Sequence, residues 1–189
     1  MAAEFGATVW GRAWLRTVES TSVTTVDSGL PKARALARNK AVEGLAVGTG
    51  RVTAGVRVKD VVYRVGLILP EWTGDMRMEA ERLVAGVAAQ RAALAPGDLP
   101  DALEADLRGA GVDLVVPAAD QVVQCDCRAR GPRCVHVVAV LYSLVQRIDE
   151  EPALALVLRS ARAARIGESA SGVERIPLGQ LDPARFYGD

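Results

Sequence analysis

The chain has only one histidine, His136, and three cysteines among its 189 residues. A Ser-His or Cys-His catalytic pair would therefore have to use that single histidine. The sequence contains no Gly-x-x-x-x-Gly-Lys loop, which excludes a P-loop ATPase, and no Cys-x-x-Cys pair, which disfavours a redox motif. These absences make an enzyme the least favoured class.

Long apolar runs are also missing. No stretch approaches the eighteen or so apolar residues that a membrane span requires. The N-terminus lacks the basic and then apolar pattern of a secretory signal. We therefore expect a soluble, cytoplasmic protein with no membrane partner.

The formal net charge is zero, but the charges are unevenly spread. Residues 1–70 have five more basic than acidic side chains, whereas residues 71–120 have six more acidic than basic ones. A basic first third could place a positive face against nucleic acid, or it could be a solvated surface without a partner. The overall charge leaves both alternatives open.

Hydrophobic periodicity predicts an α+β fold built on a three-stranded antiparallel meander with surrounding helices. Trp10 and Trp14 recur at helical spacing, and we expect them to belong to the core. The predicted strands are 42–47, 52–58 and 61–69, followed by short strands at 112–116 and 122–123. The predicted helices are 8–19, 31–38, 74–96, about 98–109, 136–148 and 152–166.

This pattern divides the chain into four parts. Residues 1–120 form an α+β N-terminal part, residues 121–150 an embedded strand–loop–helix finger, and residues 151–166 a C-terminal helix. The remaining residues, 167–189, are rich in Gly, Ser and Pro and are expected to form a flexible tail.

All three cysteines and the histidine lie within twelve consecutive residues, as Cys125, Cys127, Cys134 and His136. A structural zinc ion is held by four nitrogen or sulfur donors in a tetrahedron, and this segment supplies three sulfurs and one imidazole. The chain must curl between the first two cysteines to bring both sulfurs to one ion. The sequence predicts one structural Zn²⁺ per chain, with unligated thiols or an iron-bearing site as the alternatives.

At these residues the sequence resembles the SWIM zinc finger, whose pattern is Cys-x-Cys, a variable gap, Cys-x-His and an apolar helix. The resemblance extends over most of residues 5–160 to a bacterial group of SWIM proteins that occur beside Swi/Snf-type helicase-like ATPases. It includes FGATVWGRAW near the N-terminus and DEEPALALVLR after the finger. One departure is Val135, where that group often has lysine. The resemblance implies a non-catalytic module that binds DNA, RNA or a protein partner.

Three arginines, Arg128, Arg130 and Arg133, lie in the loop between the ligands. Guanidinium groups match phosphate oxygens, so these side chains are candidates for nucleic-acid contact. Alternatively, they offset the charge near −1 that three thiolates leave on one zinc ion.

The leading hypothesis is a zinc-binding adaptor that binds nucleic acid and acts with a helicase-like ATPase, without a small-molecule substrate. The alternative is a protein-binding or structural module in which zinc only stabilises the fold.

Overall fold

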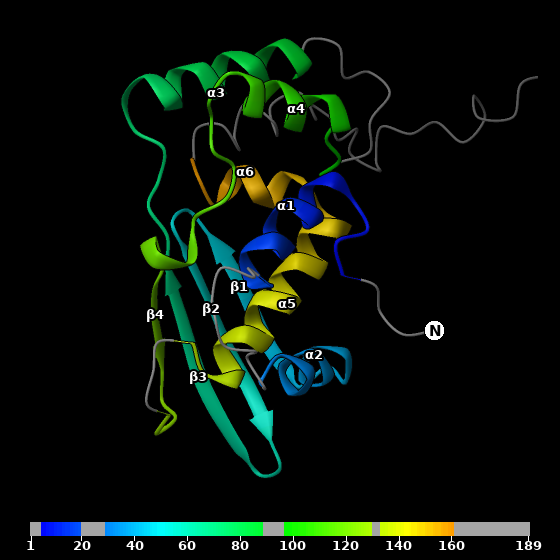
Figure 1. Ribbon diagram of the computed structural model, residues 1–189, viewed down its shortest axis with the longest axis vertical. Helices are drawn as coiled ribbons and strands as arrows, with labels where there is room; N and C mark the ends of the chain where they lie inside the picture. The colour runs from blue at the N-terminus through cyan, green and yellow to red at the C-terminus, as the bar shows by residue number, and fades with distance from the viewer. Residues whose placement is uncertain (1–4, 20–28, 89–96, 130–132, 161–189) are drawn as a thin grey trace, which may run out of the picture.

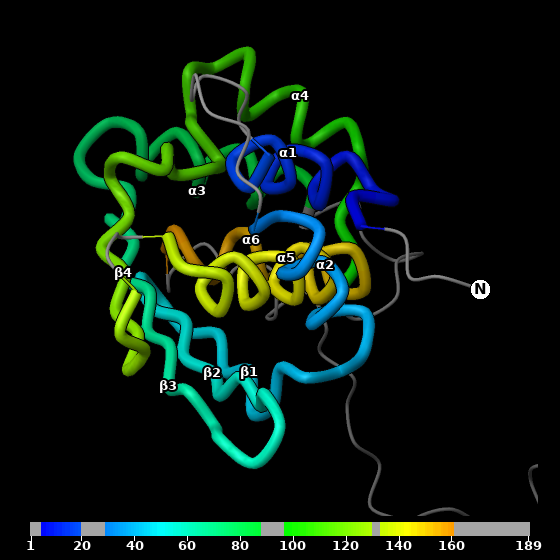
Figure 2. Tube along the Cα trace, turned by 60° about the horizontal axis from the view of Figure 1, so that its bottom comes forward, coloured from blue at the N-terminus to red at the C-terminus, as the bar shows by residue number. Residues whose placement is uncertain are grey.

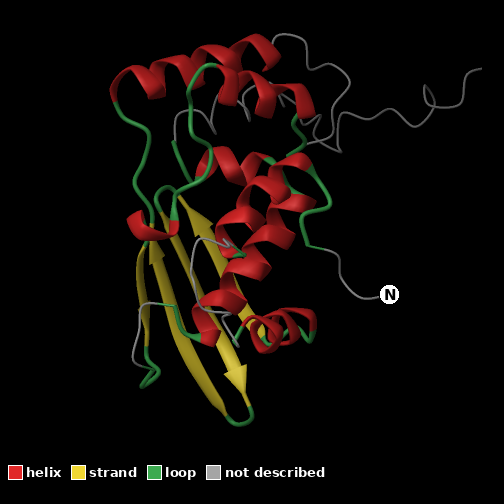
Figure 3. Cartoon of the chain, viewed as in Figure 1, coloured by secondary structure: helices red, strands yellow, loops and turns green. Residues whose placement is uncertain are grey.

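The computed structural model describes residues 5–19, 29–88, 97–129 and 133–160 (Figure 1). Pairs of helices and a run of three consecutive strands follow one another in these ranges, and the sheet is antiparallel, which confirms the predicted α+β class (Figure 3). The elements are α1 (Val9–Val18), α2 (Leu30–Arg38), β1 (Val42–Gly48), β2 (Arg51–Val58), β3 (Val61–Ile68), α3 (Gly74–Ala88), α4 (Asp101–Gly109), η1 (Ala118–Asp120, a 3-10 turn), β4 (Val122–Cys125), α5 (Val135–Glu150) and α6 (Ala153–Val157).

The sheet has four antiparallel strands in the order β1-β2-β3-β4, not the three that the sequence predicts. The fourth strand pairs with β3, with Val122 opposite Ile68 and Cys125 opposite Val65. Without it, β3 would present a row of unpaired backbone groups at its edge. The predicted strand at 122–123 therefore extends to the first zinc-ligand candidate and joins the sheet.

The strand predicted at 112–116 is wrong. This segment is a loop, although Val112, Leu114 and Val116 are buried in alternation. The loop is held by the indole of Trp72, whose Nε1 donates to the Asp113 carbonyl over 2.8 Å. The alternating burial therefore reflects a loop that packs against the core, and not a strand held by a ladder of backbone hydrogen bonds.

Helix α5 is the centre of the core. Ten of its sixteen residues are buried, and Figure 2 shows it between the sheet and α1. Trp10 and Trp14 of α1 are 0% and 1% exposed, which confirms their predicted place in the core. Within the described ranges, none of the helices is long and apolar enough to cross a lipid bilayer.

The carboxylate of Asp149 ties the start of α1 to the end of α5. It accepts hydrogen bonds from the backbone N–H groups of Gly6 (2.7 Å) and Thr8 (2.8 Å) and from the Thr8 hydroxyl (2.9 Å). Gly11 lies so close that an added Cβ would be 2.0 Å from Asp149 Oδ1. Because Gly11 has no side chain, the Asp149 carboxylate of α5 has room to cap the N-terminus of α1.

The last predicted helix, 152–166, is shorter in the structure. Helix α6 ends at Val157, and residues 161–166, like the predicted tail at 167–189, lie outside the described residues. The carbonyls of Leu158 and Arg159 accept hydrogen bonds from the N–H groups of Gly50 (3.1 Å) and Trp72 (2.8 Å). These bonds to the sheet and the following loop replace the continuation of the helix.

Candidate metal centre

The four predicted ligands come together at the end of β4 and the start of α5. Cys125 is the last residue of β4, and the chain bends at residues 126 and 127, as the spacing of the first two cysteines requires. Cys134 is the N-cap residue of α5, and His136 is in its first turn. The positive end of the helix dipole thus faces a cluster that carries negative charge once the thiols ionise.

The geometry of this cluster fits one zinc ion. The sulfur atoms and the imidazole nitrogen all lie within 4.8 Å of one another, and Cys125 Sγ is 3.8 Å from His136 Nδ1. A tetrahedron with bonds of about 2.3 Å has edges of about 3.8 Å. A small contraction around the ion therefore gives a closed Cys₃His site, and zinc is its cofactor.

The electrostatics of the cluster also favour a cation. Burial raises the pKa of the Cys125 thiol to about 12, and the neighbouring Cys127 and Cys134 side chains contribute to the rise. Burial lowers the pKa of His136, and the positive charge of Lys32 lowers it further. The imidazole is therefore neutral at pH 7, as a ligand must be, while ionisation of Cys125 needs the positive charge of a metal ion.

Two residues outside the predicted ligand set act on the His136 imidazole, one by ring stacking and one by its charge. The ring of Tyr63 in β3 stacks on His136 with centroids 4.2 Å apart and an angle of 13°. Lys32 in α2 is near enough to affect its pKa. The sequence could have indicated that Tyr63 lies on the inner face of the sheet, because it alternates with Val65 and Leu67. The position of that face beside the finger, however, follows only from the pairing of β4 with β3.

The three candidate arginines lie in different environments. Arg128 is exposed, and Arg130 lies outside the described residues. Arg133 is half-buried, and its Nη1 donates to the Thr17 carbonyl of α1 over 3.1 Å. Arg128 thus forms no ion pair within the described ranges, whereas Arg133 is directed onto α1.

Asp126 separates the first two cysteines and points out of the cluster. Its carboxylate pairs with Arg64 of β3 over 2.9 Å, and its N–H donates to the Arg64 carbonyl over 3.2 Å. These contacts anchor the bend between Cys125 and Cys127 to the sheet.

Comparison with known proteins agrees with this geometry. Residues 116–145 match the family model of the SWIM zinc finger, which confirms the resemblance for the finger segment. The chain is also similar to the uncharacterized protein Rv2102 of Mycobacterium tuberculosis, at 31% identity over 134 residues. That alignment covers 69% of this chain and 48% of the relative, so the chain spans about half of the relative's length. No solved structure matches the chain.

Proposed function

We propose that the chain is a zinc-stabilised, non-catalytic adaptor that binds nucleic acid with the end of the molecule that carries the finger. The observation behind this proposal is a group of five exposed cations, which we call the basic end. None of them is in an ion pair within the described residues. The five are Lys32, Arg38, Lys40, Lys59 and Arg128.

The elements that carry these cations lie together. Helix α2, the β2–β3 turn and the start of α5 occupy the same end of the molecule (Figure 1). Lys32 is close to His136, and the residue after Lys40 accepts a backbone hydrogen bond from Arg57, near the turn that contains Lys59. Asp60 is the one exposed carboxylate in that turn. The excess of positive charge favours a polyanion.

The aromatic residues support contact with phosphates rather than with bases. All three tryptophans and Tyr142 are buried, and Tyr63 is stacked on His136. The described residues therefore offer no exposed ring on which a base could stack, as proteins that bind single strands commonly do. Binding through phosphates predicts weak dependence on sequence and strong dependence on salt.

A catalytic role has little support. The only histidine and all three cysteines belong to the zinc cluster, and four protein ligands leave no open position for water or substrate. None of the three cysteines forms a disulfide, as is usual in a reducing compartment, and we infer a cytoplasmic protein.

The test is a salt titration of binding to a fluorescent DNA duplex and a single strand. The triple variant Lys32→Gln, Lys59→Gln, Arg128→Gln should lower the steepness of log affinity against log salt by about 2–3, because each lost phosphate contact removes roughly 0.7–0.9. The matched control is Arg77→Gln, Arg82→Gln, Arg108→Gln, which removes the same charge from α3 and α4 at the opposite end (Figure 1). Equal slopes for the two triple variants, or no binding by the wild type at low salt, would reject the proposal.

A protein partner is the second candidate, because the outer face of the sheet exposes apolar side chains. Ile68 and Val122 are 46% and 56% exposed and are paired across β3 and β4. The resemblance over most of residues 5–160 suggests a helicase-like ATPase as that partner. Co-purification with such an ATPase that is lost on changing Ile68→Asp, with zinc content unchanged, would support this candidate.

A further inference from the structure

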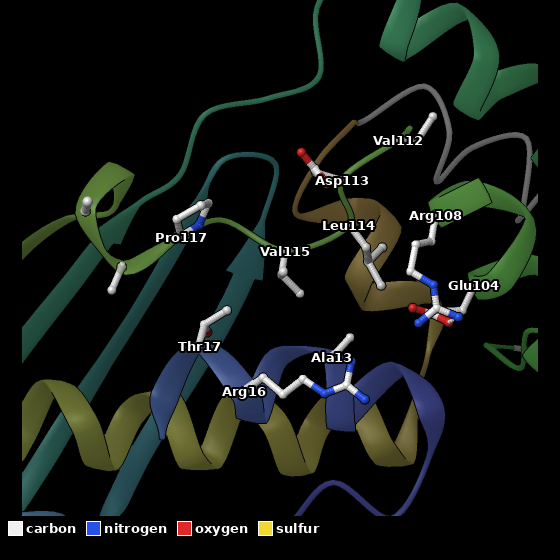
Figure 4. Close-up of a pocket in the computed structure, with 12 residues that line it drawn as sticks. Ala13, Arg16, Thr17, Glu104, Arg108, Val112, Asp113, Leu114, Val115 and Pro117 are labelled. Carbon is white, nitrogen blue, oxygen red and sulfur yellow. Dashed lines mark ion pairs between the residues drawn. The ribbon is translucent and has the colours of Figure 1, made fainter. Parts of the chain in front are cut away.

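A pocket of about 470 Å³ lies between α1, α4 and the loop of residues 112–119 (Figure 4). This volume is within the range of about 300–1,000 Å³ in which proteins bind small ligands. The walls come from α1 through Ala13 and Thr17, and from the loop through Leu114, Val115 and Pro117. The pocket is separate from the zinc cluster, since none of the four ligands lines it.

The walls of this pocket are mainly apolar. Ala13, Val112 and Leu114 are at most 8% exposed, so they belong to the core and are fixed by its packing. Pro117 fixes the backbone of the loop that closes the other side. Apolar walls whose side chains are held in place favour a ligand with an apolar body, because the apolar surfaces of pocket and ligand are both removed from water on binding.

Charged groups are concentrated on one side of the pocket. Figure 4 shows the guanidinium of Arg16 on the side where Glu104 and Arg108 lie. Glu104 is only 9% exposed, and its carboxylate pairs with Arg108 over 3.4 Å. Arg16 has no ion-pair or hydrogen-bond partner among the described residues. The carboxylate of Asp113 points away from both arginines in Figure 4.

We infer that this pocket binds an organic anion that combines an apolar body with a single carboxylate. The carboxylate pairs with Arg16, whose planar guanidinium matches two carboxylate oxygens. A cation would face Arg16, which has no ion-pair partner in the described part of the chain, because Glu104 is already paired with Arg108. A neutral apolar molecule would remove Arg16 from water without giving it a partner, which is unfavourable.

The experiment uses three probes with the same phenyl body and different head groups: 4-phenylbutanoate, 4-phenylbutanamide and 4-phenylbutylamine. Each is titrated into the zinc-loaded, nitrogen-15-labelled full chain, and the amide shifts of Ala13, Thr17, Leu114 and Val115 are followed. The carboxylate should bind with a Kd of about 1 mM, which is reasonable for a ligand of this size. The amide should bind about tenfold more weakly, and the amine more weakly still.

Two exposed arginines of α1 provide the variant and its control. Arg16→Gln should reduce the preference for carboxylate over amide to about twofold or less, while Arg16→Lys should keep part of it. Arg12→Gln, one turn earlier and outside the pocket lining, should leave the preference at about tenfold. The inference is overturned if the pocket amides do not shift at about 20 mM 4-phenylbutanoate. It is also overturned if the amine binds as well as the acid, or if Arg16→Gln keeps the wild-type preference.

Discussion

Arg128 and Arg133 are both candidate phosphate contacts in the sequence, but they are expected to respond differently to neutralisation. Arg133 is half-buried, its Nε and Nη2 atoms are buried, and its Nη1 donates to the Thr17 carbonyl. Arg128 is exposed in the loop after the second cysteine. Arg133→Gln should therefore change stability, whereas Arg128→Gln should change nucleic-acid binding.

The magnitudes follow from these environments. A hydrogen bond from a charged donor contributes about 1.5–3 kcal/mol, and the shorter amide of glutamine does not replace it. For a chain of this length, each kcal/mol lowers Tm by about 2–4 °C, so Arg133→Gln should melt about 3–12 °C below the wild type. Arg128→Gln should change stability by no more than about 0.5 kcal/mol. It should reduce the salt slope of binding by roughly 0.7–0.9.

The assays are scanning calorimetry of zinc-saturated protein and fluorescence anisotropy with labelled DNA at several salt concentrations. Zinc content must be equal in all samples, because loss of metal would also lower Tm. If Arg133→Gln melts with the wild type and flattens the salt slope as Arg128→Gln does, the guanidinium reaches phosphate instead of α1. The structural argument for Arg133 would then be wrong.

Three further predictions concern packing and the metal. Gly11→Ala should lower the free energy of unfolding, measured in urea, by about 2–4 kcal/mol, because its Cβ would displace the Asp149 carboxylate. The control Gly86→Ala, with nothing within 4 Å of the added Cβ, should instead raise the free energy of unfolding by about 0.5–1 kcal/mol. Tyr63→Ala should weaken zinc binding about tenfold in competition with a chelator, since the imidazole loses the ring that orients it, while Tyr63→Phe should bind zinc like the wild type. Cys127→Ser should abolish zinc binding and speed amide hydrogen exchange in β4 and the first turn of α5, and faster exchange throughout the buried centre of α5 would contradict the expected local effect.

The zinc cluster could be predicted from the sequence because its information is local. All four donors lie within twelve residues, so the ligand set needed no knowledge of distant contacts. The helices and the first three strands were predictable for a similar reason, since each has its own periodicity and turn residues.

Other features depend on contacts between distant segments. The pairing of β4 with β3 joins residues about sixty positions apart. The contact between Arg133 and α1 spans 116 positions. The end of α6 is determined by hydrogen bonds to Gly50 and Trp72, neither of which is in the helix. No local pattern encodes such contacts, which is why two arginines of one loop could not be distinguished before the position of α1 was known.

The same contacts bear on whether the cations near the finger serve the zinc or a partner. Three thiolates and one Zn²⁺ carry a charge near −1, so one or two nearby cations are enough to balance the cluster. Lys32 is one of these cations, because its positive charge lowers the pKa of His136. The basic end, however, contains five exposed cations that form no ion pair within the described ranges, and Lys40 and Lys59 belong to turns beyond the ligand loop. Compensation of the cluster therefore accounts for part of this charge, and the excess is what a phosphate backbone would neutralise.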